Sequence, residues 1–463
     1  MQPPTERLTL REVCDRLDRL PASWFHAKIL VVAGLSLLFD VLDTAVTGFV
    51  LASLRPAWHF DVKTIGTVSA IGLSGYLVGS FICGFVADRL GRKKTILFTM
   101  ILYSVFSASR GLTHTVGVFA LLNFFTWFFV GAESSTVPPY LAELWPARIR
   151  GKLVGWMMGF FGAGIALSSV WSLLTIPTLG WRWALLLTAP FGLIVGILRW
   201  VLPESPRWLV RAGRASEAEQ VLTRIEETVA KSTGRALPAV LPSPRELQPV
   251  SKLAAPRELL GAAYRRLSIM LWVAWFAEFG VLYTYQIFLP TILAAEGHSI
   301  VKSFLYSVVI YSSVVPGYIA GGYVAEWLDR KYAIFLSFVF VAVFGTLFAH
   351  ARTPVQIMAF AGLTVFFLSI GSTAIYTYTP EVHPTEIRTT AMGIASAWGR
   401  VGAVTMLLVF GHYFATLGKS LFFLVIDPVL IGAAIVVLCF GPSTRGRPLQ
   451  ETQLGAITES LSG

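Results

Sequence analysis

Six ionisable side chains lie inside long apolar runs of the sequence, where an unpaired charge is costly. They are Asp40, Asp43, Glu133, Glu278, Arg400 and Asp427. An ionised group near the centre of a bilayer costs about 2.5–3.5 kcal/mol on insertion scales, so each one must find a partner, take up a proton or line a wet cavity. The residue types indicate acids that can exchange protons and a cation that can hold an anion.

The acids differ in what their positions predict. Asp40 and Asp43 are three residues apart and share one helix face. Keeping two carboxylates ionised in one dry site costs free energy, so the pair is suited to picking up a proton. The alternative is a buried pair that fixes its helix against a neighbouring helix. Glu133 lies ten residues before Glu143, or about 15 Å along a helix, which places it near mid-depth. For Glu133 the alternative is a hydrogen bond to a nearby Ser or Thr, and for Glu278 it is a protonated acid tied to its own helices.

Arg400 occurs in "SAWGRVGAV", about ten residues into an apolar run. Its side chain can hardly extend to either surface from there. A planar guanidinium offers bidentate recognition of a carboxylate, which could belong to a substrate or to one of the buried acids.

Aromatic and amide side chains could complete a pocket around this cation. A flat aromatic acid could stack on their rings while its carboxylate meets Arg400, although any single ring could equally serve helix packing. The candidates are Trp398, Tyr283, Tyr285, Gln286, Tyr376, Tyr378, Phe39 and Trp127.

The composition predicts the elements that hold these residues. Of 463 residues, 55% are hydrophobic and 14% are charged, whereas a typical soluble domain has about 25% charged residues. About twelve apolar runs are long enough to cross a bilayer as helices. We therefore expect an all-α membrane protein with twelve transmembrane helices. The runs are 27–50, 64–87, 93–110, 116–141, 152–175, 181–202, 266–289, 303–325, 332–350, 354–378, 389–412 and 420–441.

The formal net charge of +11 follows the topology of the chain. With a cytosolic amino terminus, about 28 Lys and Arg residues fall on the cytosolic side and about 7 outside, the bias that orients membrane proteins. The basic charge is thus a topology signal and does not indicate nucleic acid binding. We expect both termini in the cytosol and read no removable signal peptide in the charged first 26 residues.

A shift of 238 residues aligns the two halves of the chain without a gap. It pairs Asp40 with Glu278, Arg92 with Arg330, and Glu143 with Glu381. The halves are therefore predicted to be two copies of a six-helix bundle, and two bundles that rock about a midplane site are typical of secondary transporters. The expected segments are 1–26 (cytosolic), 27–203 (first bundle), 204–265 (cytosolic linker with short helices), 266–441 (second bundle) and 442–463 (cytosolic tail).

"GFVADRLGRKK" at 84–94, its degraded copy "GGYVAEWLDRK", "PESPRWL" at 203–209 and "PSTRGRPLQE" at 442–451 resemble signatures of the major facilitator superfamily. "LFDVLDTAVTGFVL", "GAESSTVPPYLAELWP" and "AWGRVG" look most like its niacin-porter branch, which is related to organic-anion carriers and synaptic-vesicle glycoprotein 2. Ser443 departs from the sugar porters, which usually carry Glu there.

The resemblance implies roles for particular residues. It implies an anion-binding role for Arg400 and a functional carboxylate at Glu133. It also implies a cytosolic latch between the bundles, formed by charges at the helix ends. The residues of this gate are Asp88, Arg92, Glu143, Arg148, Arg150, Glu326, Arg330, Glu381 and Arg388.

The expected function is alternating-access import of a small organic anion by proton symport, with nicotinate as the best guess for the substrate. A proton-coupled importer of aromatic acids or sugars, a drug exporter and a non-transporting receptor are the alternatives. No phosphate-binding "GxxxxGK[ST]" motif, metal-ligand spacing or catalytic pairing is found, so we expect no cofactor, no metal and no enzyme. We expect a monomer in the plasma membrane.

Overall fold

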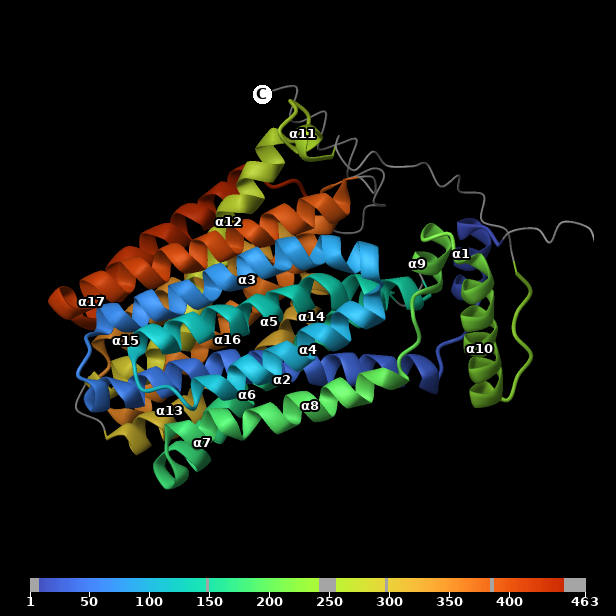
Figure 1. The fold of residues 1–463 in the computed structure, drawn as a ribbon. Coiled ribbons are helices and arrows are strands. Elements are labelled where there is room, and N and C mark those ends of the chain that lie inside the picture. Colours follow the sequence, from blue (N-terminus) through green and yellow to red (C-terminus); the bar gives the residue numbers. More distant parts are fainter. Residues whose placement is uncertain (1–7, 147–149, 241–254, 296–298, 384–386, 445–463) are drawn as a thin grey trace, which may run out of the picture.

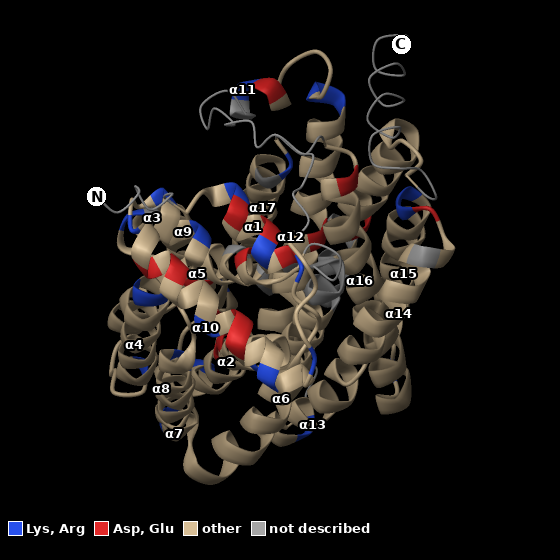
Figure 2. Ribbon diagram, turned by 90° about the vertical axis from the view of Figure 1, so that its right-hand side faces the viewer, with Lys and Arg blue, Asp and Glu red and all other residues tan. Residues whose placement is uncertain are grey.

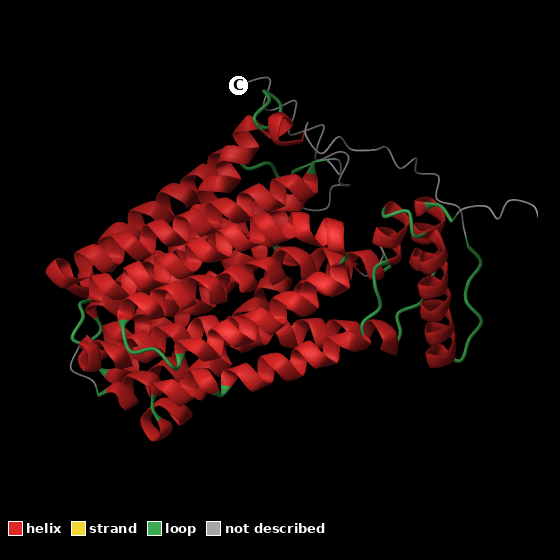
Figure 3. Cartoon of the chain, viewed as in Figure 1, coloured by secondary structure: helices red, strands yellow, loops and turns green. Residues whose placement is uncertain are grey.

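The computed structural model describes residues 8–146, 150–240, 255–295, 299–383 and 387–444, and helices make up the regular structure of this part of the chain (Figures 1 and 3). The first half contains α2 (Trp24–Trp58), α3 (Val62–Leu90), α4 (Arg92–Arg110), α5 (Val116–Leu144), α6 (Arg150–Leu179), α7 (Trp181–Leu186), α8 (Thr188–Leu198) and η2 (Arg199–Val201). The second half contains α12 (Arg265–Ala295), α13 (Ile300–Tyr311), α14 (Val314–Trp327), α15 (Arg330–His350), α16 (Pro354–Glu381) and α17 (Arg388–Phe440). Outside the two bundles lie α1 (Leu10–Asp18), α9 (Pro206–Arg211), α10 (Ala215–Thr233) and α11 (Ala255–Leu259).

These helices confirm the twelve predicted spans. Ten helical segments are long and apolar enough to cross a membrane. Two more complete the set: α4, which carries several charges, and the shorter apolar stretch Ile426–Phe440. α17 supplies two crossings. It begins shortly after the end of α16, and the residue Pro442 that follows its own end lies at the same level, because the Tyr378 hydroxyl near the end of α16 donates to the carbonyl of Pro442 over 2.7 Å.

Prolines explain why two of the spans are broken. α13 ends at Tyr311 and α14 begins at Val314, just ahead of Pro316. A proline removes one helical hydrogen bond and clashes with the carbonyl four residues earlier, here that of Ser312. Pro190 acts in the same way on Leu186, where α7 ends.

Equivalent contacts in the two bundles reproduce the sequence repeat. Arg92 Nη2 donates to Glu143 over 3.4 Å, and Arg330 Nη2 donates to Glu381 over 3.0 Å. The Tyr140 hydroxyl donates to the carbonyl of Pro203 over 2.7 Å, as Tyr378 does to Pro442. Each bundle is therefore tied internally by the same two links.

A small helical annex made of α1, α9 and α10 lies at one end of the bundles, called the linker end below (Figure 1). Seen from that end, Lys, Arg, Asp and Glu gather on the helix ends and the annex (Figure 2). Arg16 and Arg19 of α1 donate to Glu226 of α10 over 2.6 Å each. Burial alone would raise the pKa of Glu226, but these two hydrogen bonds outweigh it and lower the pKa. The clamp fixes α1 against the linker helix.

Glycines bring the two bundles into backbone contact towards the opposite end, called the far end. A Cβ atom added to Gly48 of α2 would lie 2.8 Å from the carbonyl oxygen of Ile287 in α12. One added to Gly66 of α3 would lie 2.4 Å from the carbonyl oxygen of Leu407 in α17. The bundles are thus closely packed at the far end, where a side chain would hold them apart.

We expect Gly66→Val to destabilise this closely packed state, because the new side chain collides with backbone that cannot rotate away. Overpacking of this kind costs about 1–3 kcal/mol. Thermal unfolding of the purified protein in detergent should occur at a lower temperature, and amide exchange around Leu407 should become faster. Gly432→Val is the matched control, since a Cβ there has no neighbour within 4 Å. Equal unfolding temperatures for Gly66→Val and wild type would contradict the predicted contact.

Candidate functional site

Arg400 lies in the first crossing of α17 and reaches across to the other bundle. Its Nη2 donates to the hydroxyl of Tyr76 in α3 over 3.0 Å. Its Nη1 donates to the hydroxyl and the carbonyl of Ser396 over 2.7 and 3.2 Å. The guanidinium carbon lies 5.0 Å from the ring centre of Tyr76 and 4.6 Å from that of Phe279 in α12. The cation therefore lies at the junction of the bundles, between one aromatic ring from each.

Further aromatic rings surround Phe279. Its ring centre is 5.0 Å from Trp275 and 6.2 Å from both Tyr376 and Tyr283. Tyr283 in turn lies 6.2 Å from Trp127 of α5, in the first bundle. These flat surfaces from α5, α12 and α16 could accommodate an aromatic ring next to the guanidinium.

Arg400 is only 7% exposed, and in the described part of the chain it forms no ion pair with a carboxylate. Its Nε atom is buried without a hydrogen-bond partner. Arg110 and Arg199 are buried as deeply, but Asp43 binds the first and Glu133 binds the second. A buried charge without a partner is unfavourable, so the Arg400 guanidinium has capacity left for an anion.

Asp43 belongs to a polar network inside the first bundle. Arg110 Nη2 donates to one carboxylate oxygen, and both side chains are completely buried. The hydroxyls of Ser107 and Thr188 donate to the other oxygen over 2.7 and 3.1 Å. Both carboxylate oxygens of Asp43 therefore have hydrogen-bond partners.

Glu133 and Arg199 form a second buried ion pair in the same bundle. Asp40 lies on α2, three residues before Asp43, and is buried. The Oδ1 atom of Asp40 is buried without a hydrogen-bond partner. The predicted Asp40 and Asp43 pair is thus divided, since Asp43 has its own cation and Asp40 does not.

Glu278 occupies the equivalent position of the second bundle. It is fully buried and accepts a hydrogen bond from the hydroxyl of Ser372, while its Oε2 has no partner. The repeat predicted that Asp40 and Glu278 correspond, and each has an incompletely bonded carboxyl group.

The other predicted pocket residues divide between the junction and more distant places. Tyr283, Tyr376 and Trp127 belong to the aromatic cluster near Arg400. Trp398, only two residues from Arg400, is 41% exposed and stacks on Trp272, so it faces away.

Of the four remaining pocket residues, Tyr285, Tyr378 and Phe39 pack elsewhere. Tyr285 packs against Phe423 within the second bundle, and Tyr378 binds the carbonyl of Pro442. Phe39 stacks on Phe191. Gln286 is buried, and its Oε1 has no hydrogen-bond partner.

The predicted gate residues pair within each bundle where they are described. Arg92 with Glu143 belongs to the first bundle and Arg330 with Glu381 to the second, so neither pair joins the two. Arg388 is the first residue of α17. Arg148 and the side chains of Asp88, Arg150 and Glu326 lie outside the described residues. A latch between bundles therefore stays a prediction.

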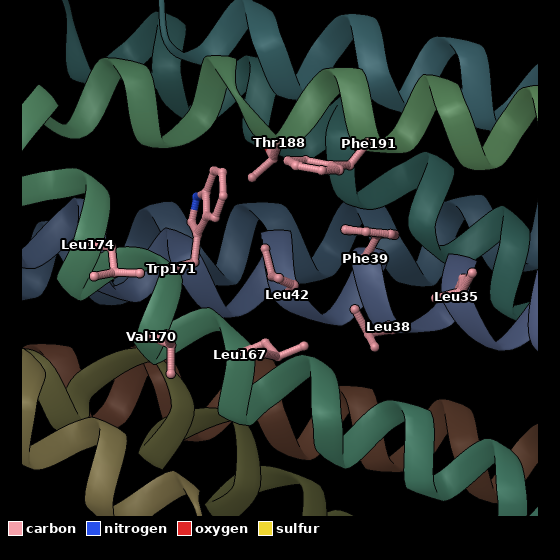
Figure 4. Close-up of a pocket in the computed structure, with 10 residues that line it drawn as sticks. All are labelled: Leu35, Leu38, Phe39, Leu42, Leu167, Val170, Trp171, Leu174, Thr188 and Phe191. Atoms are coloured by element: carbon pink, nitrogen blue, oxygen red, sulfur yellow. The ribbon is translucent and has the colours of Figure 1, made fainter.

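An apolar cavity of about 310 Å³ lies between α2, α6 and α8 (Figure 4). Thr188 is the single polar residue of its lining, which offers no cation to a carboxylate. This cavity is therefore unsuited to an organic anion. Its lining residues are Leu35, Leu38, Phe39, Leu42, Leu167, Val170, Trp171, Leu174, Thr188 and Phe191.

Comparison with known proteins matches residues 28–455 to the model of the family described as "Sugar (and other) transporter". The chain belongs to this family. Among curated relatives, the niacin transporter NiaP of Acinetobacter baylyi is 30% identical over 96% of this chain and 100% of its own length. A gallate transporter of Pseudomonas putida is also 30% identical, over 93% and 95%. The 4-hydroxybenzoate transporter PcaK of Pseudomonas aeruginosa is 27% identical, over 87% and 88%.

A solved structure supports the fold assignment. The inward open conformation of the xylose transporter XylE from E. coli superposes with a TM-score of 0.72 at 19% identity, over 93% of this chain and 99% of XylE. The chain is thus a transporter of the major facilitator superfamily with twelve membrane-spanning helices, a multi-pass protein of the plasma membrane and not an enzyme.

Sequence reasoning missed several groups of this transporter's interior. Arg110 and Arg199 stand at the ends of their apolar runs, where a charge is normally interfacial, yet both are buried in ion pairs. Tyr76 and Phe279 were missed because nothing in the sequence connects them with Arg400. The signal available in the sequence for the two arginines was a buried acid, Asp43 or Glu133, with no cation close to it along its own helix.

We expect Arg110→Met to destabilise the transporter by about 3–5 kcal/mol, because it leaves the Asp43 carboxylate buried without a cation. The double variant Arg110→Met with Asp43→Asn should recover part of the loss, since it removes both charges. Thermal unfolding in detergent measures both effects. If the double variant proved less stable than the single one, the buried pair would not be the cause.

Proposed function

We propose that this transporter imports a small aromatic monocarboxylate, with nicotinate as the best candidate, by alternating access and proton symport. One observation carries the proposal: the Arg400 guanidinium is buried between the bundles, is surrounded by aromatic rings and has no carboxylate partner among the residues that the structure describes. Bidentate binding of a carboxylate would supply the missing anion.

The relatives' printed substrates support this class of compound. Niacin, gallate and 4-hydroxybenzoate each combine an aromatic ring with a carboxylate. The Arg400 guanidinium complements the carboxylate, and the neighbouring rings of Phe279, Tyr376 and Tyr283 complement the aromatic ring. A sugar has no charge that would require a buried cation, so the site favours an aromatic acid over the sugar alternative.

In the proposed mechanism, the substrate carboxylate takes the place of the Tyr76 hydroxyl on Arg400. This exchange removes a hydrogen bond between the bundles, 27–203 and 266–441, at the moment when the substrate binds. The bundles then rock about the site. The linker end, which is rich in Lys and Arg, faces the cytosol in this proposal, with both termini on that side.

Protons would be carried by acids that lack a cation. Asp43 and Glu133 are each bound to an arginine, so their charge already has a partner. Asp40 and Glu278 have no such partner among the described residues, and a buried carboxyl group without one is less costly as the neutral acid. We therefore assign proton coupling first to Asp40 and Glu278.

A test of the anion site uses uptake of radiolabelled nicotinate by proteoliposomes. We expect Arg400→Ala to reduce uptake by about 100-fold or more and Arg400→Lys by about 10-fold, since lysine keeps the charge but lacks the planar fork. Arg224→Ala, at an exposed position of α10, is the control. Nicotinamide, of the same shape but uncharged, should compete poorly. Wild-type uptake by Arg400→Ala would overturn the proposed anion site, and ligand binding without any uptake would favour a receptor.

A test of proton coupling compares uptake with and without an inward proton gradient. Wild-type uptake should rise with the gradient, whereas Asp40→Asn should lose this response because it cannot exchange a proton. Glu227→Gln, at an exposed position of α10, should respond like wild type. A full gradient response in both Asp40→Asn and Glu278→Gln would exclude these two acids as the proton carriers.

A further inference from the structure

The indole N–H of Trp127 is a buried donor without a hydrogen-bond partner in the described structure. Trp127 is 1% exposed and lies on α5, where its ring faces Tyr283 of the other bundle at 6.2 Å. A tryptophan at a junction usually bonds its N–H when it is buried. An unmet buried donor costs free energy, so this one calls for an acceptor.

Two helices place Trp127 one turn from the Arg400 guanidinium. On α3, a Cβ atom at Gly72 would lie 3.3 Å from the Trp127 ring, and Tyr76, four residues later, binds Arg400. On α12, Tyr283 lies beside Trp127, and Phe279, four residues earlier, lies beside Arg400. One helical turn is about 5.4 Å, so the neighbours of Trp127 lie about that far along the helix axes from the neighbours of Arg400, towards the far end.

This spacing suits a ligand with a carboxylate at one end and an acceptor atom on its ring. In nicotinate, roughly 4–5 Å separates the carboxylate oxygens from the ring nitrogen, and a hydrogen bond of about 3 Å at each end extends its reach beyond one helical turn. The ring nitrogen of a pyridine has a lone pair in the ring plane and no hydrogen, so it accepts from an N–H donor. Benzoate has the same shape with a C–H group in that place.

We propose that Trp127 is the specificity-determining residue of the site, and that its Nε1–H donates to the ring nitrogen of a pyridine carboxylate bound at Arg400. The inference rests on the proposed function and makes it narrower, because Arg400 selects the carboxylate and Trp127 selects the nitrogen. A site built to hydrogen-bond a substrate atom rejects the analogue that lacks it, since the buried donor is then left unpaired.

The experiment measures the KM for nicotinate and for benzoate in proteoliposomes. Wild type should favour nicotinate by roughly 10-fold, the expected value of one neutral hydrogen bond. Trp127→Phe keeps a ring but removes the donor, so its KM for nicotinate should rise about 10-fold while its KM for benzoate stays within about 2-fold. Trp171→Phe is the matched control, because its Nε1 already donates to the carbonyl of Ala184 over 3.0 Å. It should leave the ratio of the two KM values unchanged.

Competition on the wild-type protein alone gives a second measurement that does not depend on the folding of a variant. Nicotinate should compete for uptake about 10-fold better than benzoate, with picolinate and isonicotinate, whose nitrogens lie elsewhere, in between. Equal competition by nicotinate and benzoate, or an unchanged KM ratio in Trp127→Phe, overturns the inference. Such a result leaves the anion site intact if Arg400→Ala still abolishes uptake, whereas wild-type uptake by Arg400→Ala removes the proposed function itself.

Discussion

The buried guanidinium of Arg400 is the constraint around which the junction of the two bundles is arranged. Its environment supplies a hydroxyl from Tyr76, the hydroxyl and carbonyl of Ser396, and the faces of two aromatic rings. These groups are neutral, so they lessen the cost of burial without cancelling the charge. Arg110 and Arg199 differ in kind, because each forms a closed ion pair within one bundle.

Each bundle is fixed internally, while their junction is held by contacts that can separate. The pairs Arg92 with Glu143 and Arg330 with Glu381 join helices of one bundle, as do the hydroxyl links of Tyr140 and Tyr378. The two arginine–glutamate links join opposite charges, so they are stronger than a hydrogen bond from an arginine to a neutral hydroxyl. The junction consists instead of packed aromatic rings, glycine contacts and the hydrogen bond from Arg400 to Tyr76. A rigid-body motion between bundles therefore breaks the weaker set of contacts.

The sequence was sufficient to predict what depends on local patterns. Apolar runs predicted all twelve spans, and the 238-residue repeat aligned Arg92 with Arg330 and Glu143 with Glu381, although not the pairing within each bundle that the structure shows. Contacts between helices could not be predicted from the sequence, because the burial of a side chain and its partner depend on which helix faces meet. Trp398 shows the limit: it is next to Arg400 in the sequence, but two residues along a helix turn its side chain to another face. Tyr76, 324 positions from Arg400, could be found only in three dimensions.

The buried acids and the cation of the candidate site lie in different bundles. The acids Asp40, Asp43 and Glu133 lie in the first bundle, where two arginines neutralise two of them, and Arg400 lies in the second. The hydrogen bond from Arg400 to Tyr76 connects these two sets of charges across the junction. A carboxylate that displaces Tyr76 would satisfy the cation and release the first bundle in one step. Without such a carboxylate, Arg400 stays hydrogen-bonded to Tyr76 of the opposite bundle. Because the neutral hydroxyl is the weaker ligand for a guanidinium, the proposed exchange would require an anion, and movement of the bundles would then depend on the presence of substrate.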